Sequence, residues 1–325
     1  MQRRTFLGML GASALATLDS AWAQGYPNAP VKMIVPYAPG GGADAIARLL
    51  AQGMGEQLKQ SFVVENRAGA GGMLGAEAAI RAVPDGYTVL VAGNPELTIT
   101  PWLQPKTSYE PTRDLTPIVL ISQSANVLVC HASLGATTLR KAFDAARAHP
   151  GGITVGTPGN GSAQHIALEL LRAQTGLEIV HVPYKGAGPA TMAVLGGQVS
   201  FALVGAPPLL PHFVSRKLVP LAVTQPKRSP LLANVPTLGE AMGIMRDGDF
   251  VTWYGLLVPS RTPAEAVNQL EKAAKAVLDR PNTRAQYAEL GTDLIGLPKD
   301  EFTERMRSER KRYGELVKRF NISGA

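Results

Sequence analysis

The sequence predicts an α/β protein made of two similar lobes, and two observations support this prediction. Short apolar runs rich in β-branched residues alternate with amphipathic runs of helical spacing along most of the chain. In addition, residues 39–43 (Pro-Gly-Gly-Gly-Ala) and 158–162 (Pro-Gly-Asn-Gly-Ser) form related turns, each between a predicted strand and a predicted helix. One such turn in each half of the chain indicates two lobes that each present a helix N-terminus.

The first half of the chain begins with a predicted strand at 31–35, because this run is short, β-branched and followed by the glycine turn. Residues 44–59 form a predicted helix, since apolar side chains from Ile46 to Leu58 recur at steps of three and four. The same criteria give strands at 62–65, 88–92 and 127–130, and helices near 74–83 and at 138–148.

The second half of the chain continues this alternation. Strands are expected at 153–156, 178–182, 199–204, 218–224 and 253–259, and helices at 163–175, 189–195, 263–278, 283–290 and 299–320. Pro263 and Pro281 fall near predicted helix starts, where proline is tolerated. The repeated order of strand, helix and strand predicts parallel sheets with helices on both faces.

The first 23 residues have the features of an export signal. Arg3 and Arg4 precede the apolar run 6–18, and Ala21-Trp22-Ala23 supplies small residues, so we expect cleavage after Ala23. The start of the chain also has the twin-arginine pattern of proteins exported in the folded state. An ordinary N-terminal helix or an anchor is the alternative.

Composition limits the classes of function. The 325 residues are 45% hydrophobic and 18% charged, which is typical of a folded chain. A single cysteine excludes an internal disulfide framework, and the apolar run around Cys130 predicts a buried, inert thiol. Without Arg3, Arg4 and Asp19, 30 basic and 24 acidic residues leave a net charge of about +6. This charge favours small anionic ligands, and the chain lacks the basic footprint of a nucleic-acid-binding protein.

The two glycine turns are candidates for holding an anion. The first N–H groups of a helix have no partner within the helix, and the helix dipole leaves this end partly positive. Glycine also lets a ligand approach the bare backbone. A cleft between two such helix ends could therefore hold a small carboxylate without lysine or arginine. The alternative is that each turn only reverses the chain.

The predicted binding residues belong to these two turns. In the first lobe they are Tyr37, Ala38, Pro39, Gly40, Gly41, Ala43 and Asp44. Asp44 is expected to cap the helix and to order backbone or water, because its charge would repel an anion. In the second lobe they are Thr157, Gly161, Ser162 and His165. Their hydroxyl and imidazole groups are expected to donate hydrogen bonds, with His165 facing the mouth of the helix.

A rival interpretation is an exported α/β enzyme. Residues 69–75 form a glycine loop of the kind that holds a dinucleotide in NAD(P)-dependent oxidoreductases, but no acidic residue ends the next predicted strand. Ser162 and His165 could serve a hydrolase, although the chain has no G-x-S-x-G elbow. The five histidines lack metal-ligand spacing, so no metal is expected, and the missing acidic residue means that no cofactor is expected either.

Several short motifs occur in a fixed order along the chain. They read VPYAPGG at 35–41, VENR at 64–67, GAGG at 69–72, PDGYT at 84–88, VPYKG at 182–186, LAVT at 221–224 and WYGL at 253–256. This combination resembles the substrate-binding receptors of tripartite tricarboxylate transporters, also called Bug or TctC-type proteins. The resemblance extends over essentially the whole predicted mature chain.

The resemblance implies a type II-like periplasmic-binding-protein fold, in which two Rossmann-like α/β lobes are joined by crossover strands and close on a ligand. We expect residues 24–124 and 255–325 to form lobe 1 and residues 125–254 to form lobe 2. The implied ligand is a small organic carboxylate, and the implied location is the periplasm. We expect a monomer that works with inner-membrane permease subunits or with a sensor protein.

The resemblance also implies roles for single residues. The two glycine turns match the family loops that grip a carboxylate from opposite sides, and Asn94 ends a strand that faces the cleft. Two departures from the family pattern affect the ligand. Ala43 stands where a serine or threonine is common, and Gly205 and Ala206 stand where the family often has a polar or acidic residue. Ala43 removes one hydroxyl from the first loop. The lack of an acidic residue at 205–206 disfavours an amino-acid ligand, whose ammonium group requires an acidic partner.

Overall fold

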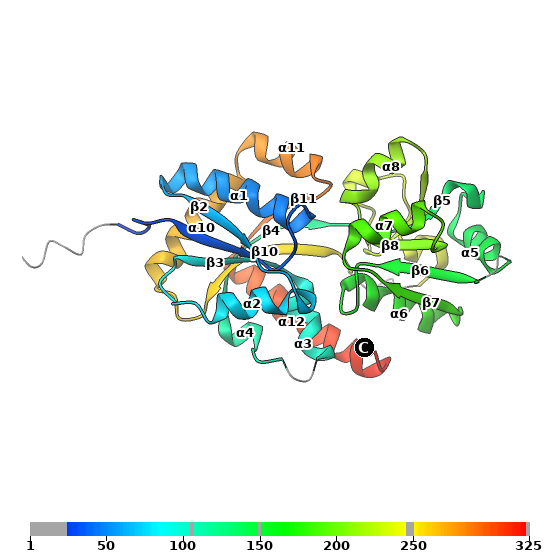
Figure 1. Cartoon of the computed structure of the whole chain (residues 1–325), viewed down its shortest axis with the longest axis horizontal. Helices are drawn as coiled ribbons and strands as arrows, with labels where there is room; N and C mark the ends of the chain where they lie inside the picture. The colour runs from blue at the N-terminus through cyan, green and yellow to red at the C-terminus, as the bar shows by residue number, and fades with distance from the viewer. Residues whose placement is uncertain (1–24, 105–106, 149–150, 245–249, 323–325) are drawn as a thin grey trace, which may run out of the picture.

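The computed structural model describes residues 25–322 except 105–106, 149–150 and 245–249. These residues form two lobes, each built on its own β-sheet (Figure 1). The predicted export signal, with its cleavage site after Ala23, lies outside the described residues. Within the described part of the chain, no helix is both long and apolar enough to span a bilayer.

The first lobe contains a six-stranded mixed sheet with the order β11-β4-β10-β3-β1-β2. Its strands are β1 (Val31–Val35), β2 (Phe62–Asn66), β3 (Thr88–Gly93), β4 (Leu115–Ser124), β10 (Thr252–Pro259) and β11 (Asp293–Pro298). β1 is parallel to β2 and β3. β10 is antiparallel to β3 and β4, and β11 is antiparallel to β4.

Helices cover both faces of this sheet, as expected for strands that are apolar on both sides. α1 (Gly42–Leu58), α10 (Ala264–Leu278) and α11 (Pro281–Glu289) contribute to the core on one face. α2 (Met73–Ile80) and the start of α12 (Lys299–Arg319) contribute to the core on the other face. Short segments complete the lobe: η1 (Ala70–Gly72), η2 (Pro95–Ile99), α3 (Thr100–Leu103) and α4 (Pro111–Asp114).

The second lobe contains a five-stranded mixed sheet with the order β7-β6-β8-β5-β9. Its strands are β5 (Asn126–His131), β6 (Ile153–Thr157), β7 (Ile179–Pro183), β8 (Phe201–Gly205) and β9 (Leu218–Val223). β6 is parallel to β7 and β8, whereas β5 is antiparallel to β8 and β9. The helical segments are η3 (Ala132–Leu134), α5 (Leu139–Arg147), α6 (Ala163–Thr175), α7 (Ala187–Leu195), η4 (Pro207–Leu209), α8 (Leu210–Val214), η5 (Pro230–Leu232) and α9 (Leu238–Met242).

The chain crosses between the lobes in two extended segments. β4 ends at Ser124 and β5 begins at Asn126 in the other sheet, so Ala125 alone separates the two strands. The return crossing enters β10 at Thr252, next to the buried residues Phe250 and Val251. These crossings explain why β10 runs antiparallel to β3 and β4, since it re-enters the first sheet from the side of the second lobe.

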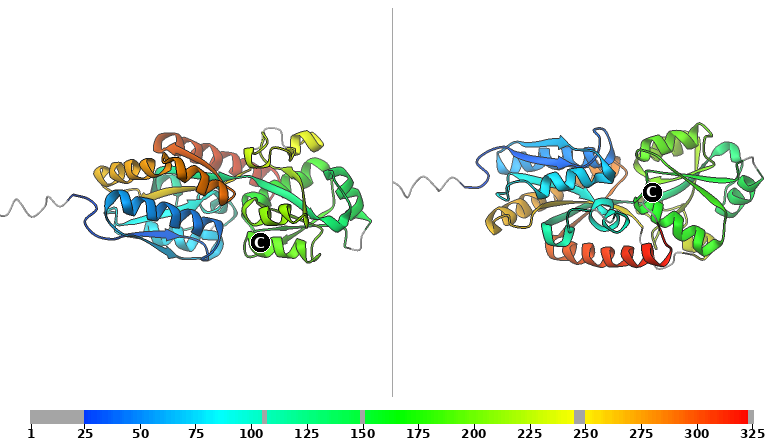
Figure 2. Two further views of the ribbon diagram at one scale, coloured as in Figure 1. Left: turned by 90° about the horizontal axis from the view of Figure 1, so that it is seen from above. Right: turned by 60° about the horizontal axis from the view of Figure 1, so that its bottom comes forward.

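The last long helix, α12, also links the lobes. Near its start, Phe302 and Met306 are buried in the first lobe beside Trp253. Near its end, Tyr313 and Val317 belong to a core cluster of the second lobe. Figure 2 shows the helix running along one side of the molecule from one lobe to the other.

The predicted strands and helices are all present, with ends that shift by a few residues. Two strands, β4 and β11, were not predicted from the sequence. The prediction of parallel sheets is wrong in part, because both sheets are mixed. An alternation of strands and helices gives the order of elements, but it does not give the direction in which a strand arrives from another lobe.

Candidate functional site

The two glycine turns lie at the ends of the lobes that face each other (Figure 1). The first turn follows the carboxyl end of β1 and the second follows the carboxyl end of β6. The second turn reaches the first lobe, because a Cβ placed on Gly161 would lie 3.2 Å from Thr100 Oγ1 and 3.4 Å from Leu103 Cδ1. The carboxyl ends of strands are where ligands bind in open α/β sheets.

Asp44 holds the first turn in shape. One carboxylate oxygen accepts hydrogen bonds from Gly40 N and from Arg48 Nε, both at 2.9 Å. The other accepts from Asn66 Nδ2 at 2.9 Å, and the same amide nitrogen donates to the Tyr37 carbonyl at 3.0 Å. The expected ordering of backbone by Asp44 is confirmed. Its carboxylate, however, reaches back to Gly40, one residue before the helix N-cap, and does not cap the helix itself.

The ionisation of Asp44 follows from these contacts. Burial opposes the charged form, but the hydrogen bonds from Arg48, Gly40 and Asn66 outweigh it and lower the pKa of the carboxyl. The negative charge is therefore matched by a cation and two N–H donors. Since no side chain caps α1 at Gly41, the positive end of this 17-residue helix stays accessible next to three exposed residues, Gly40 to Gly42.

A buried carboxyl, which the sequence did not single out, supports the same turn from behind. The side chain of Glu96 is fully buried and accepts hydrogen bonds from Tyr37 Oη at 2.5 Å and from Gly93 N at 2.7 Å. Burial raises the pKa of Glu96 to about 7, against the opposing effect of these hydrogen bonds. The Tyr37 ring also packs edge-on against Tyr254, at 6.4 Å between centroids. Tyr37 is thus fixed by partners from β10 and η2.

The second turn is closed by its own hydrogen bonds. Ser162 is the N-cap of α6: its Oγ accepts from His165 N at 3.1 Å and donates to the Gly159 carbonyl at 2.8 Å. Gly161 N donates to His165 Nδ1 at 3.3 Å. The Ser162 hydroxyl and His165 Nδ1 therefore make hydrogen bonds within the turn in this structure. Their contact with a ligand stays a prediction.

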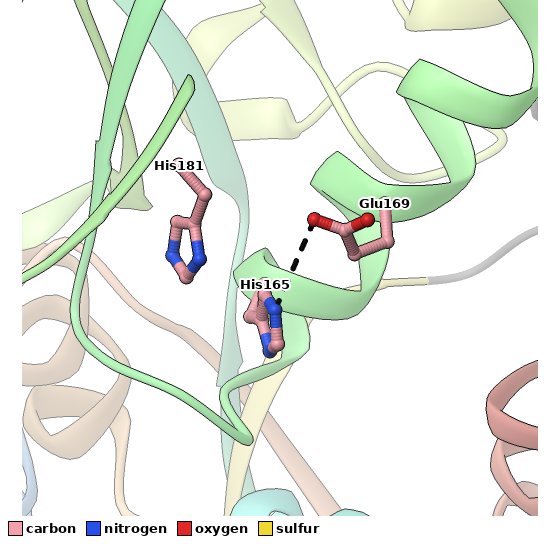
Figure 3. A group of neighbouring side chains, drawn as sticks. All are labelled: His165, Glu169 and His181. Carbon is pink, nitrogen blue, oxygen red and sulfur yellow. Dashed lines mark ion pairs between the residues drawn. The ribbon is translucent and has the colours of Figure 1, made fainter. Parts of the chain in front are cut away.

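His165 turns toward the interior of the second lobe and stacks on His181 of β7, with ring centroids 4.4 Å apart and planes at 14° (Figure 3). Nε2 of His181 is 2.7 Å from the Thr157 hydroxyl, which in turn accepts from Gly159 N at 3.3 Å. Burial lowers the pKa of both histidines to about 4, so both rings are neutral at pH 7. His181 was not predicted from the sequence; its contribution depends on the pairing of β6 with β7.

A third helix end lies at the same edge of the second lobe. β7 runs parallel to β6, so α7 begins beside the second turn, and Gly186 N donates to the Pro158 carbonyl at 2.9 Å. The N-cap of α7 is Gly186, at φ 117°, and no side chain caps the helix. The VPYKG motif at 182–186 was the sequence signal for this segment.

The remaining predicted residues lie at the crossings between the lobes. Asn94 is fully buried and donates from Nδ2 to the Val251 carbonyl at 2.8 Å, while its Oδ1 has no partner among the described residues. Gly205 and Ala206 are buried as well, and Ala206 N donates to the Ala125 carbonyl at 2.9 Å. A Cβ on Gly205 would lie 3.8 Å from both Asn126 Oδ1 and Ser124 Oγ. Contact of Asn94, Gly205 and Ala206 with a ligand stays a prediction.

The glycine loop at 69–72 has a packing role. A Cβ on Gly72, at φ 95°, would lie 2.9 Å from Glu96 Oε2, and a Cβ on Gly69 would lie 2.5 Å from Leu74 Cδ1. Gly72 thus allows the loop to pack closely on Glu96, and Gly69 makes room for the side chain of Leu74. The prediction for Cys130 is confirmed: the thiol is buried, and burial raises its pKa to about 11.

Comparison with known families gives a direct assignment. Residues 46–322 match the family model described as the tripartite tricarboxylate transporter family receptor. The chain belongs to this receptor family. It is 32% identical to the protein BugT of Bordetella pertussis over 297 residues, which cover 90% of this chain and 88% of that protein.

Solved structures support this assignment. An R. palustris protein solved with adipate superposes with a TM-score of 0.85 at 30% identity and covers 92% of this chain and 99% of its own. MatC from Rhodopseudomonas palustris, solved with bound malate, gives a TM-score of 0.79 at 28% identity, covering 90% and 100%. The two-lobed fold of a periplasmic binding protein is therefore confirmed for this family receptor.

Proposed function

We propose that this protein is a periplasmic receptor that captures a small organic carboxylate between its two lobes and presents it to a tripartite transporter. The observation that carries the proposal is the uncapped N-terminus of α1, which opens onto the exposed glycine turn at the end of the lobe that faces its partner lobe. The adipate and malate bound by the two R. palustris proteins support a dicarboxylate ligand.

The proposed chemistry is binding without reaction. N–H groups at the start of α1 donate to one carboxylate group, while Asp44, neutralised by Arg48, keeps the turn open and fixed. Charge-assisted hydrogen bonds of this kind stabilise by about 1.5–3 kcal/mol each. The turn at 157–162 and the start of α7 supply donors from the other side. Lobe closure then excludes water, which strengthens these hydrogen bonds.

The division into lobes is part of the proposal. In this proposal residues 24–124 with 255–325 move as lobe 1 against residues 125–254 as lobe 2, and the two crossings act as the hinge. Two parts of the chain depart from these bounds: β10 pairs in the first sheet from Thr252 onward, and the end of α12 packs in the second lobe, so α12 must bend or slide during closure. Ligand drives closure because it binds the closed form better than the open form. The receptor acts as a monomer, is exported by the segment 1–23, and delivers its ligand to membrane permease subunits.

A thermal unfolding screen tests the proposal. Tag-free mature protein is mixed with malate, adipate, citrate and aromatic carboxylates, with acidic amino acids and NADPH as further arms. We expect at least one carboxylate to raise the unfolding temperature by mass action, without being consumed over hours. Stabilisation by NADPH alone, or turnover of the stabilising carboxylate, would instead establish the exported enzyme.

A further inference from the structure

A group of three potential metal ligands lies in the second lobe next to the second glycine turn, and it includes His165 of that turn. His165 and Glu169 come from successive turns of α6, and His181 comes from β7 (Figure 3). One ligand atom from each side chain lies within 4.8 Å of the other two. His165 Nε2 is 3.9 Å from Glu169 Oε1. We propose that these three residues bind a divalent transition-metal ion of the zinc type.

The donor set matches this class of metal. Two imidazole nitrogens and one carboxylate oxygen are the protein ligands of many zinc sites that leave a fourth position for water. Imidazole donors favour zinc, copper and nickel over calcium and magnesium, which require oxygen ligands. The three side chains are also partly shielded from solvent, since His165 is buried and the side chain of Glu169 is 20% exposed.

The neighbouring groups are those that orient metal ligands. With Nε2–H of His181 donating to the Thr157 hydroxyl, Nδ1 carries the free lone pair. Arg172 Nη1 donates to both oxygens of Glu169 at 3.0 Å, which fixes the carboxylate beside His165.

Metal binding requires a local rearrangement that keeps protons in balance. The rings are nearly parallel, so one of them must turn before both lone pairs point at a common centre. His165 Nδ1 accepts from Gly161 N, which places the ring proton on Nε2. When Nε2 binds the metal, that proton moves to Nδ1, the ring stays neutral and the hydrogen bond from Gly161 is lost. The sequence spacing missed this group because His181 comes from a different element.

The site is tested by calorimetric titration of ZnCl2 into tag-free, chelator-stripped protein at pH 7, without a carboxylate. We expect one equivalent of zinc to bind, and we expect Glu169→Gln and His181→Gln each to weaken binding about tenfold or more. His212→Gln, which changes a histidine of the same lobe outside the group, is the matched control and is expected to bind like the parent. Magnesium and calcium are expected to give no heat of binding.

The alternative is that the stacked histidines only support the second turn. No zinc binding by the parent protein, or equal binding by the parent and both variants, would overturn the proposal. If His181→Gln fails to fold, as judged by circular dichroism, Glu169→Gln decides the question because it leaves both imidazoles in place. The test uses no carboxylate, so its result is independent of the proposed transport function.

Discussion

Asn126 Oδ1 accepts a hydrogen bond from the Thr252 hydroxyl at 3.0 Å, and this contact joins the two segments by which the chain crosses between the lobes. The same oxygen accepts from Gln164 Nε2 at 2.8 Å, and Asn126 Nδ2 donates to the Phe250 carbonyl. Asn126 is fully buried. One side chain therefore connects both crossings to the start of α6, which carries the second glycine turn.

Asn126→Ala is expected to destabilise the protein, because it removes three hydrogen bonds at once: those with the Phe250 carbonyl, Gln164 Nε2 and the Thr252 hydroxyl. Gln164 Nε2 still donates to Thr252 Oγ1, and the Phe250 carbonyl still accepts from Thr224 Oγ1, so each lost bond is expected to cost about 0.5–1.5 kcal/mol. Thr252→Val removes two of the hydrogen bonds in this cluster, the one donated to Asn126 Oδ1 and the one accepted from Gln164 Nε2, and is expected to cost less. Urea unfolding of both variants measures the free energy of unfolding. Equal stability of Asn126→Ala and the parent would show that the crossings do not depend on this contact.

Two glycines in helices should respond to alanine in opposite directions. In α12, a Cβ on Gly314 would lie 2.6 Å from Trp102 Cε2, so the clash outweighs the gain in helix propensity and Gly314→Ala is expected to destabilise by about 1–3 kcal/mol. In α7, a Cβ on Gly188 meets nothing within 4 Å. Gly188→Ala is therefore expected to stabilise by about 0.5–1 kcal/mol. The unfolding temperatures of the two variants test this prediction. If both variants were more stable than the parent, the Trp102 ring would be able to move away from the added methyl group.

Asp44→Asn is expected to weaken carboxylate binding about tenfold or more. The substitution removes the charge that holds Arg48 and one of the acceptors for Gly40 N and Asn66 Nδ2, so the turn loses its fixed shape. Arg48→Gln keeps the carboxylate and its bond to Gly40, and its effect on affinity should be smaller. Calorimetric titration with the carboxylate found in the screen compares the three proteins. If Asp44→Asn bound the carboxylate with the affinity of the parent, carboxylate binding would not depend on the shape that Asp44 gives this turn.

The sequence predicted the order of elements, the two turns and the ordering role of Asp44, because each depends on residues close together in the chain. β5 was predicted but β4 was missed. Ala125 alone separates the two strands, so neither a helix nor a glycine or proline turn marks the point where the chain passes from one sheet to the other. The antiparallel direction of β10 was also missed, because it depends on the path that the chain takes through the second lobe before it returns.

The supporting side chains of the site could not be predicted in the same way. Glu96 contacts Tyr37 from 59 positions away, and His181 contacts Thr157 from 24 positions away. Both contacts exist only because neighbouring strands or the segments after them come together in the fold. A lone buried glutamate or histidine gives no pattern in one sequence. The orientation of His165 was likewise decided by a partner in β7.

Glu96 and the two stacked histidines are expected to make stability depend on pH in opposite ways. The Glu96 carboxyl titrates near 4.5 in the unfolded chain and near 7 in the folded protein. Between these values the folded protein holds a proton that the unfolded chain has released, so this group makes stability fall as pH rises. His165 and His181 titrate near 6.5 when unfolded and near 4 when folded. In that range the unfolded chain holds the extra protons, so stability falls as pH drops.

The two effects overlap between about pH 4.5 and 6.5, and single substitutions separate them. In Glu96→Gln the histidines act alone, so stability should rise more steeply with pH than in the parent. His181→Gln removes one of the two histidines that make stability rise with pH. Plotted against pH, the stability of this variant should therefore rise less, or fall more, than that of the parent. Urea midpoints at pH 4.5, 5.5, 6.5 and 7.5 give the slopes. Equal slopes in the parent and Glu96→Gln would mean that Glu96 is already ionised in the folded protein and that Tyr37 donates to a buried charge behind the first turn. Equal slopes in the parent and His181→Gln would mean that folding does not lower the pKa of His181.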